Sequence, residues 1–217
     1  MIELHFAPGA CSFVPHVGLE RIRQDGGADF TPRLVKLHKG EQRTAEFLSI
    51  NPNGQVPVLI VDGKPLHQIV AICDWLDRAN PGSGLLPTDA WARAQALSQL
   101  AWMNNTVHPT FTHVFMPNRF ADDEQVQQAI RAHAAVQYRG LLERVASMIP
   151  GNTRFWAGEH PGFHDAYAFT LLRWGGYAGI DPASVPGLHA HVLRVMEHPA
   201  VAAVIERERV GLDTYKG

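Results

Sequence analysis

The chain has 217 residues, of which 46% are hydrophobic and 18% charged, a globular balance with enough apolar material for one large domain or two small ones. Its formal net charge of −2 argues against non-specific nucleic-acid binding, which depends on an excess of lysine and arginine. No apolar stretch approaches the roughly 18 residues of a membrane span, and the alternating start predicts no signal peptide. The two cysteines, Cys11 and Cys73, do not make a disulfide scaffold, so we expect a cytoplasmic protein with reduced thiols.

Strand and helix signals alternate along the first eighty residues. The pattern predicts a half-buried strand at 2–6, a helix from Ser12 to 25, a second strand within 30–37 and a short helix within 41–48. A β-branched run at 56–61, a tight Asp62-Gly63 turn and a returning strand from Pro65 predict a hairpin, and apolar spacing predicts a helix over 69–79. This order indicates a small α/β domain.

Everything after residue 88 has helical spacing. We expect an α/β domain over 1–80, a Pro- and Gly-rich linker over 81–88, and an all-helical domain over 89–217. The expected helices of the second domain cover 89–107, 122–149, 164–177, 188–197 and 199–209.

Six stretches, in this order, carry a family resemblance: PGACSFVPHVGL, NPNGQVPVL, QIVAICDWL followed by GLLP, VHPTFTHVFMP, FHDAYAFTLLRW and HPAVAAVIERE. Together they resemble the cytosolic glutathione transferases, and the first favours the bacterial beta-type, cysteine-bearing enzymes. The resemblance implies a thioredoxin-like domain followed by a helical domain, with the active site in the cleft between them. It also implies a homodimeric detoxification enzyme that uses glutathione as cosubstrate and transfers it to small apolar electrophiles.

Cys11 is the candidate catalytic thiol. It follows a Pro-Gly turn and precedes a helix, whose unpaired backbone N–H groups favour anions and predict a lowered thiol pKa. A small buried apolar residue is the plainer interpretation. Ser12 is the rival, because some members of the family use a serine hydroxyl in this region.

The resemblance assigns the glutathione contacts to three segments. It implies a cis Val56-Pro57 bond whose backbone pairs with the cysteinyl part of glutathione, and it places Gln68 and Ile69 at the γ-glutamyl group. Ile69 departs from the family's small or hydroxylated residue, although its backbone N–H stays at a helix start. Lys39 is the candidate for the glycyl carboxylate, and a solvated surface lysine is the alternative.

His108 aligns with a family histidine that reaches the glutathione site, where it would act as a cation or proton donor. A packed helix histidine is the alternative. Thr106 and Pro109 stand where the family often has an acidic residue and a lysine, and Pro109 is expected to kink the helix.

Phe13, Phe111 and Phe115, with Met116, are the candidates for an apolar electrophile pocket, and core packing is the alternative. Asp165 is expected to cap its helix, but Gly162 provides no reciprocal side chain. No metal is expected, because the histidine pairs lack the spacing and the third ligand of a zinc site.

Three functions remain open from the sequence: a glutathione transferase, a glutathione-dependent thiol–disulfide oxidoreductase acting through Cys11, and a non-enzymatic binding protein of the same fold. The departures at Ile69, Thr106 and Pro109 motivate the third.

Overall fold

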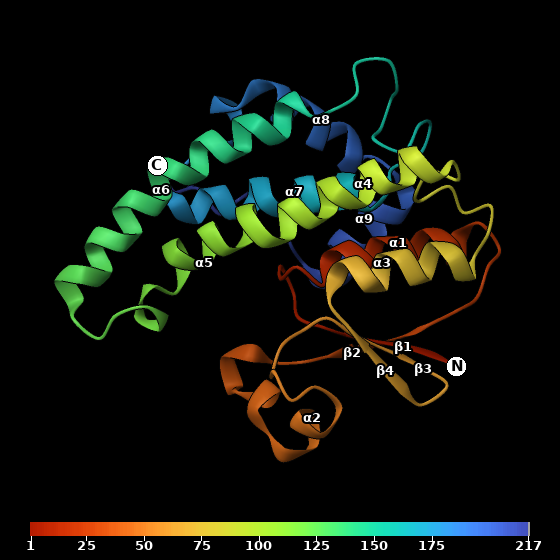
Figure 1. The fold of residues 1–217 in the computed structure, drawn as a ribbon, viewed down its shortest axis with the longest axis horizontal. Coiled ribbons are helices and arrows are strands. Elements are labelled where there is room, and N and C mark those ends of the chain that lie inside the picture. Colours follow the sequence, from red (N-terminus) through yellow and green to blue (C-terminus); the bar gives the residue numbers. More distant parts are fainter. Residues whose placement is uncertain (217) are drawn as a thin grey trace.

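The computed structural model describes residues 1–216, and its first part is a four-stranded mixed sheet (Figure 1). The strands are β1 (Ile2–Phe6), β2 (Thr31–Leu34), β3 (Val58–Val61) and β4 (Lys64–His67), in the order β2-β1-β3-β4. β1 pairs parallel with β2 and antiparallel with β3, and β3 and β4 form the predicted hairpin. The second strand is shorter than predicted.

Helices cover both faces of this sheet. Their bounds are α1 (Phe13–Gln24), α2 (Ala45–Ile50) and α3 (Ile69–Ala79), with 3-10 turns at Leu37–Lys39 and Glu41–Arg43. α1 and α3 lie together on one face, and α2 lies on the other (Figure 1). The helix expected within 41–48 is therefore displaced, because Gly40 adopts a left-handed φ of 74° and Thr44 caps α2 by accepting from the N–H of Phe47.

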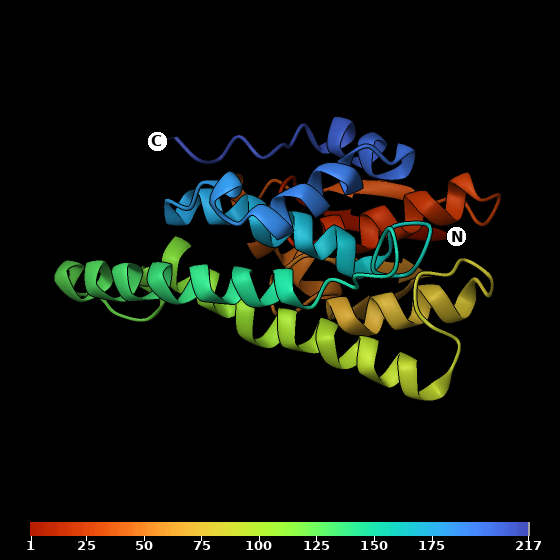
Figure 2. The same ribbon diagram turned by 90° about the horizontal axis from the view of Figure 1, so that it is seen from above.

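The second part is helical. It consists of α4 (Ala90–Trp102), α5 (His108–Phe115), α6 (Glu124–Ser147), α7 (Phe163–Gly175), α8 (Pro186–Met196) and α9 (Pro199–Glu208), with 3-10 turns at Pro117–Arg119, Gly176–Ala178 and Pro182–Ser184. α6 packs along α5 and α7 and extends beyond them (Figure 2). The thioredoxin-like first part and the all-helical second part confirm the predicted fold class.

A π-helical turn, Met103–Val107, joins α4 to α5. The helical run continues without a break into α5, and Pro109, which has no N–H to donate to the preceding turn, directly follows this π-helical turn. The chain thus accommodates this proline by changing its helical pitch just before it. The expected kink at Pro109 stays a prediction.

Apolar contacts join the two parts. Phe13 on α1 stacks on Phe169 of α7 with ring centroids 4.6 Å apart, and both are buried. A Cβ added to Gly18 would lie 2.3 Å from Phe163, so only glycine allows α1 to approach α7 this closely. The two parts therefore share one hydrophobic core.

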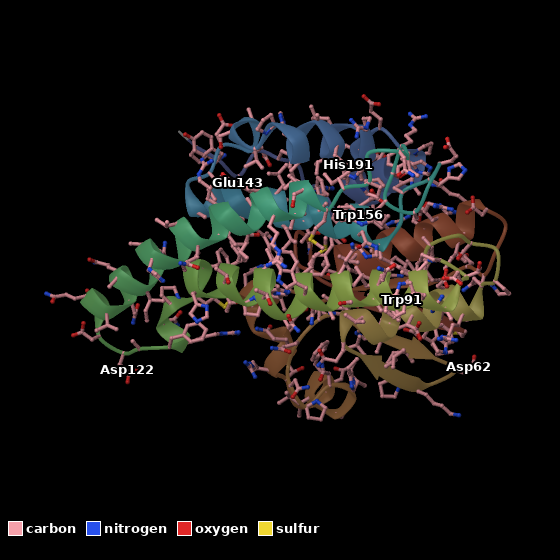
Figure 3. All side chains as sticks on the ribbon, turned by 45° about the horizontal axis from the view of Figure 1, so that its top comes forward. Asp62, Trp91, Asp122, Glu143, Trp156 and His191 are labelled. Atoms are coloured by element: carbon pink, nitrogen blue, oxygen red, sulfur yellow. The ribbon has the colours of Figure 1, made fainter. Side chains whose placement is uncertain are left out.

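Asp165 holds the beginning of α7, as predicted. Its carboxylate accepts hydrogen bonds from the backbone N–H groups of Gly162 at 2.7 Å and Trp156 at 3.1 Å. His191 lies 2.7 Å from the same carboxylate, and Figure 3 shows Trp156 and His191 close together. Asp165 therefore belongs to the fold. Within residues 1–216, no helix has both the length and the apolar character needed to cross a membrane.

Candidate active site

A cleft of about 990 Å³ opens between the loops of the first part and the helices α5 and α7. The first part contributes residues 7–11, 34–39, 42, 51, 54–57 and 67–69, and the second part contributes residues 104, 108, 111, 112, 115, 116, 119, 173, 174 and 177. All the predicted site residues line this cleft except Ser12 and Phe13.

Cys11 borders the cleft, and its thiol donates a hydrogen bond to the carbonyl oxygen of Val56 at 3.6 Å. Its side chain is only 8% exposed. This burial raises the pKa of the Cys11 thiol to about 12, because desolvation of the thiolate outweighs the nearby backbone N–H groups. The expected lowering of the thiol pKa is therefore wrong, and the thiol holds its proton at neutral pH.

Ser12 and Phe13 turn away from the cleft. The Ser12 hydroxyl accepts from the N–H of Ala7 and donates to the carbonyl of the same residue, which closes the turn after β1. The ring of Phe13 is fully buried against α7. The expectation that Phe13 walls the electrophile pocket is wrong, because the first turn of α1 points this ring into the core.

The loop before β3 carries the predicted cis bond between Val56 and Pro57. Asn51 holds this loop: its side-chain amide donates to the carbonyl of Gln55 at 2.6 Å and accepts from the N–H of Asn53 at 3.1 Å. The sequence showed Asn51 only as a turn residue. Its burial is what identifies it as the anchor of the loop that faces Cys11.

α3 begins at Ile69, at the edge of the cleft. Gln68 precedes it with a φ of 70°, a left-handed conformation that is rare for a residue with a side chain and that concentrates at functional sites. The Gln68 side chain makes no capping hydrogen bond and is exposed. The side chain of Ile69 is buried, so this position presents its backbone N–H at the helix start.

Lys39 lies at the cleft edge in an exposed 3-10 turn. Lys36, which the sequence did not single out, lines the cleft beside it and lies 3.8 Å from Glu41. Lys39 makes no ion pair within residues 1–216.

His108 enters the cleft from the first residue of α5. Its Nδ1 is 3.1 Å from the hydroxyl of Tyr167, which in turn donates to Asn104 at 3.2 Å. Burial lowers the pKa of His108 to about 4. The ring is therefore neutral at pH 7, and the expectation of a cation is wrong.

The turn that precedes Cys11 is held from the second part. Glu208 at the end of α9 accepts a hydrogen bond from the N–H of Gly9 at 3.0 Å and lies 2.7 Å from His16 on α1. The indole of Trp174 donates to the carbonyl of Gly9 at 2.9 Å. Both backbone groups of Gly9 are thus fixed by helices more than 160 residues away in the chain.

An aromatic wall forms the second side of the cleft. Phe111 stacks on Trp174 with centroids 4.6 Å apart and on Phe115 at 5.4 Å, and Tyr177 lies 5.3 Å from Phe115. The sequence predicted the two phenylalanines, but it did not single out Trp174, the last residue of FHDAYAFTLLRW, or Tyr177, three residues further on. Arg119 and Arg173 also line this side and were not predicted. Among residues 1–216, no three His, Cys, Asp or Glu side chains are grouped so as to hold a metal ion.

Known proteins resemble this chain in sequence and in fold. The family model "Glutathione S-transferase, N-terminal domain" matches residues 17–78. The chain is 29% identical over 208 residues to glutathione S-transferase GST-4.5 of Xanthomonas campestris pv. campestris, covering 95% of this chain and 98% of that protein.

Solved structures share the whole fold. A glutathione transferase homologue from Sulfitobacter with bound glutathione superposes with a TM-score of 0.87 at 26% identity, covering 97% of this chain and 99% of that one. A sphingomonad glutathione S-transferase complexed with glutathione is 30% identical with a TM-score of 0.78, covering 96% of this chain and 100% of that one.

Proposed function

Because this chain belongs to the cytosolic glutathione S-transferase superfamily and is a glutathione S-transferase enzyme, we propose that it joins glutathione to small electrophiles in the cleft between its two parts. The same membership of an enzyme family argues against the non-enzymatic binding protein that the sequence left open. Residues 1–80 form the proposed glutathione-binding domain, residues 81–88 the linker, and residues 89–217 the domain that supplies the electrophile pocket.

Glutathione is proposed to lie along the first domain. Its cysteinyl backbone pairs with Val56 before Pro57, and its γ-glutamyl group lies at Gln68 and at the N–H of Ile69. A carboxylate is favoured there because the first N–H groups of α3 have no partners within the helix. Lys39 is placed to attract the glycyl carboxylate.

Cys11 is proposed to turn its S–H from the carbonyl of Val56 to the sulfur of glutathione. The observation that carries this role is the buried, protonated thiol at the cleft wall, with a pKa of about 12 and a donor contact to Val56. A group that keeps its proton can stabilise a neighbouring thiolate by hydrogen bonding, although S–H is a weak donor. The neutral ring of His108 is a second hydrogen-bonding group, held by Tyr167.

The reaction is a displacement at carbon. The thiolate of glutathione provides the electron pair of the new C–S bond, the leaving group departs with the electron pair of the bond that breaks, and the thiol proton passes to solvent. The protein positions both reactants and stabilises the thiolate before attack.

The test combines calorimetric titration with glutathione and turnover of 1-chloro-2,4-dinitrobenzene. We expect Cys11→Ala to bind glutathione but to lower kcat/KM about three- to tenfold, the value of one neutral hydrogen bond. The rising limb of its pH–rate profile should move to higher pH. The control is Cys73→Ala, a buried cysteine on α3 outside the cleft. No glutathione binding at millimolar concentration would contradict the proposed function, and an unmoved pH profile in Cys11→Ala would contradict the role of Cys11.

The oxidoreductase alternative needs a Cys11 thiolate that attacks a glutathione disulfide, forms a mixed disulfide and releases one glutathione thiolate. The raised pKa of Cys11 disfavours this step. Intact mass after incubation with oxidised glutathione should therefore show no adduct on Cys11. An adduct that disappears in Cys11→Ala would favour the alternative.

We also propose that the enzyme works as a homodimer in the cytoplasm. Both cysteines are free and buried, which fits a reducing compartment. Sedimentation equilibrium would test the dimer: a single species of the monomer mass would contradict it.

A further inference from the structure

The cleft carries an excess of positive charge. Four of its lining side chains are cationic, namely Lys36, Lys39, Arg119 and Arg173, and within residues 1–216 none is Asp or Glu. The whole chain has a net charge of −2, so this excess is local to the cleft. A cleft lined by one sign of charge concentrates ligands of the opposite sign.

The four cations divide between the two sides. Lys36 and Lys39 belong to the first domain, where glutathione and its two carboxylates are proposed to bind. Arg119 follows α5 and Arg173 lies on α7, on the side of the aromatic wall. Because these two arginines are not assigned to glutathione, they are available to bind the second substrate.

Arg173 has unused hydrogen-bonding capacity. Its Nη2 makes one long contact, 3.5 Å to the hydroxyl of Tyr177, and its Nε is buried without a hydrogen-bond partner, so a ligand would be bound through Nη1 and Nη2. No carboxylate of residues 1–216 lies within ion-pair distance of it. A guanidinium fork in this state is matched by a planar carboxylate, which accepts two parallel N–H bonds.

The guanidinium lies close to the reacting centre. A Cβ added to Gly9 would lie 2.7 Å from Nη1 and 3.0 Å from Cζ of Arg173, so the cation packs against the glycine two positions before Cys11. Its Cζ is 5.7 Å from the ring centroid of Tyr177, which belongs to the aromatic wall. The cation and the aromatic surface therefore lie beside the turn that leads to Cys11.

We propose that the electrophile is an aromatic compound bearing a carboxylate, with its ring against the aromatic wall and its carboxylate bound by Arg173. This inference rests on the proposed transferase function. With an aryl chloride, the glutathione thiolate forms a C–S bond at the ring carbon, chloride leaves with the electron pair of the C–Cl bond, and the carboxylate is unchanged. Since the carboxylate is bound equally before and during attack, Arg173 acts mainly on KM.

The test compares 4-chloro-3,5-dinitrobenzoate with 1-chloro-2,6-dinitrobenzene, which differ only in the carboxylate. Each kcat/KM is divided by the uncatalysed rate constant of the same compound with glutathione. We expect the wild-type enzyme to prefer the carboxylate at least about tenfold, and Arg173→Gln to lower that ratio about tenfold to a hundredfold through KM. Arg173→Lys, which keeps the charge but not the fork, should retain part of the ratio. Arg131→Gln, an exposed arginine on α6 outside the cleft, should leave it unchanged.

A wild-type ratio near one, with the neutral compound turned over, would overturn this inference and leave the proposed function standing. Loss of glutathione affinity in Arg173→Gln, with an unchanged ratio, would assign Arg173 to glutathione and also overturn it. Absence of glutathione binding and of any turnover would overturn both. If Arg173→Gln does not fold, the test uses the wild-type enzyme alone. Its preference for the carboxylate compound should then fall at high ionic strength, and a preference that does not change with salt would overturn the inference.

Discussion

Burial sets the charge of two polar residues that line the cleft, Cys11 and His108. It raises the pKa of Cys11 to about 12 and lowers that of His108 to about 4, so that both side chains are neutral at pH 7. The two shifts have opposite directions and one cause, since a low dielectric disfavours the charged form of either group. In the proposed reaction, such neutral donors would stabilise the glutathione thiolate by hydrogen bonding.

His108 makes folding stability depend on pH. The unfolded ring has the ordinary pKa of 6.5 and the folded ring one of about 4, so the unfolded chain takes up this proton first as the pH falls. The contribution is fully present above pH 6.5 and is lost as the pH falls through 4, by up to about 3 kcal/mol. Urea unfolding at pH 7 and pH 4 should show a smaller difference for His108→Asn than for wild type. His133→Asn, an exposed histidine on α6, should match wild type, and an equal pH dependence in His108→Asn would contradict the assignment.

At the scale of elements, helix α9 fixes the turn that precedes Cys11. Glu208 connects the N–H of Gly9 to His16 on α1, and Arg207 extends the network to Glu20 at 3.1 Å. Glu208 and His16 are both fully buried at their side chains. The last helix of the chain thus fixes the geometry of a loop at its beginning.

Glu208→Gln should destabilise the protein by about 3 kcal/mol, because it removes one partner of a buried charged network and leaves the others desolvated. The measurement is urea unfolding at pH 7. Glu206→Gln, an exposed glutamate two residues earlier on α9, should change stability by less than about 0.5 kcal/mol. Equal effects of the two substitutions would show that the buried network does not hold the turn.

At the scale of the whole molecule, the two parts are joined by a shared core. α1 of the first part packs on α7 and α9 of the second, with Phe13 and Phe169 at the centre of the contact. Both walls of the cleft are therefore built on the same hydrophobic core. We therefore expect one unfolding transition for the entire chain.

Phe13→Ala should lower the free energy of unfolding by about 3–5 kcal/mol, since it removes a fully buried ring and leaves a cavity between the parts. Urea unfolding followed by circular dichroism and by tryptophan fluorescence should give coincident single transitions in wild type. Val136→Ala, at a side chain 75% exposed on α6, is the control and should change stability by less than about 0.5 kcal/mol. Two separated transitions in wild type would contradict the shared core.

The sequence alone determined the order of the elements, the fold class and most of the cleft lining. Hydrophobic periodicity and turn residues depend only on residues close together in the sequence, so they can be recognised from the sequence itself. The predicted helix over 69–79 and the hairpin before it lie where expected. Motif order then assigned Cys11, Val56 and His108 to one site, and all three line the cleft.

Only the tertiary structure decided the protonation of that site and which side chains complete it. Cys11 stands before a helix, which by itself favours a thiolate, but burial among residues distant in the chain reverses the direction of its pKa shift. Phe13 and Phe111 look alike in sequence, yet one fills the core and the other borders the cleft. Desolvation and the pairing of charges depend on atoms brought together from both parts. The proposed role of Arg173 could not be predicted from the sequence, because it depends on Gly9 and the aromatic wall lying beside it.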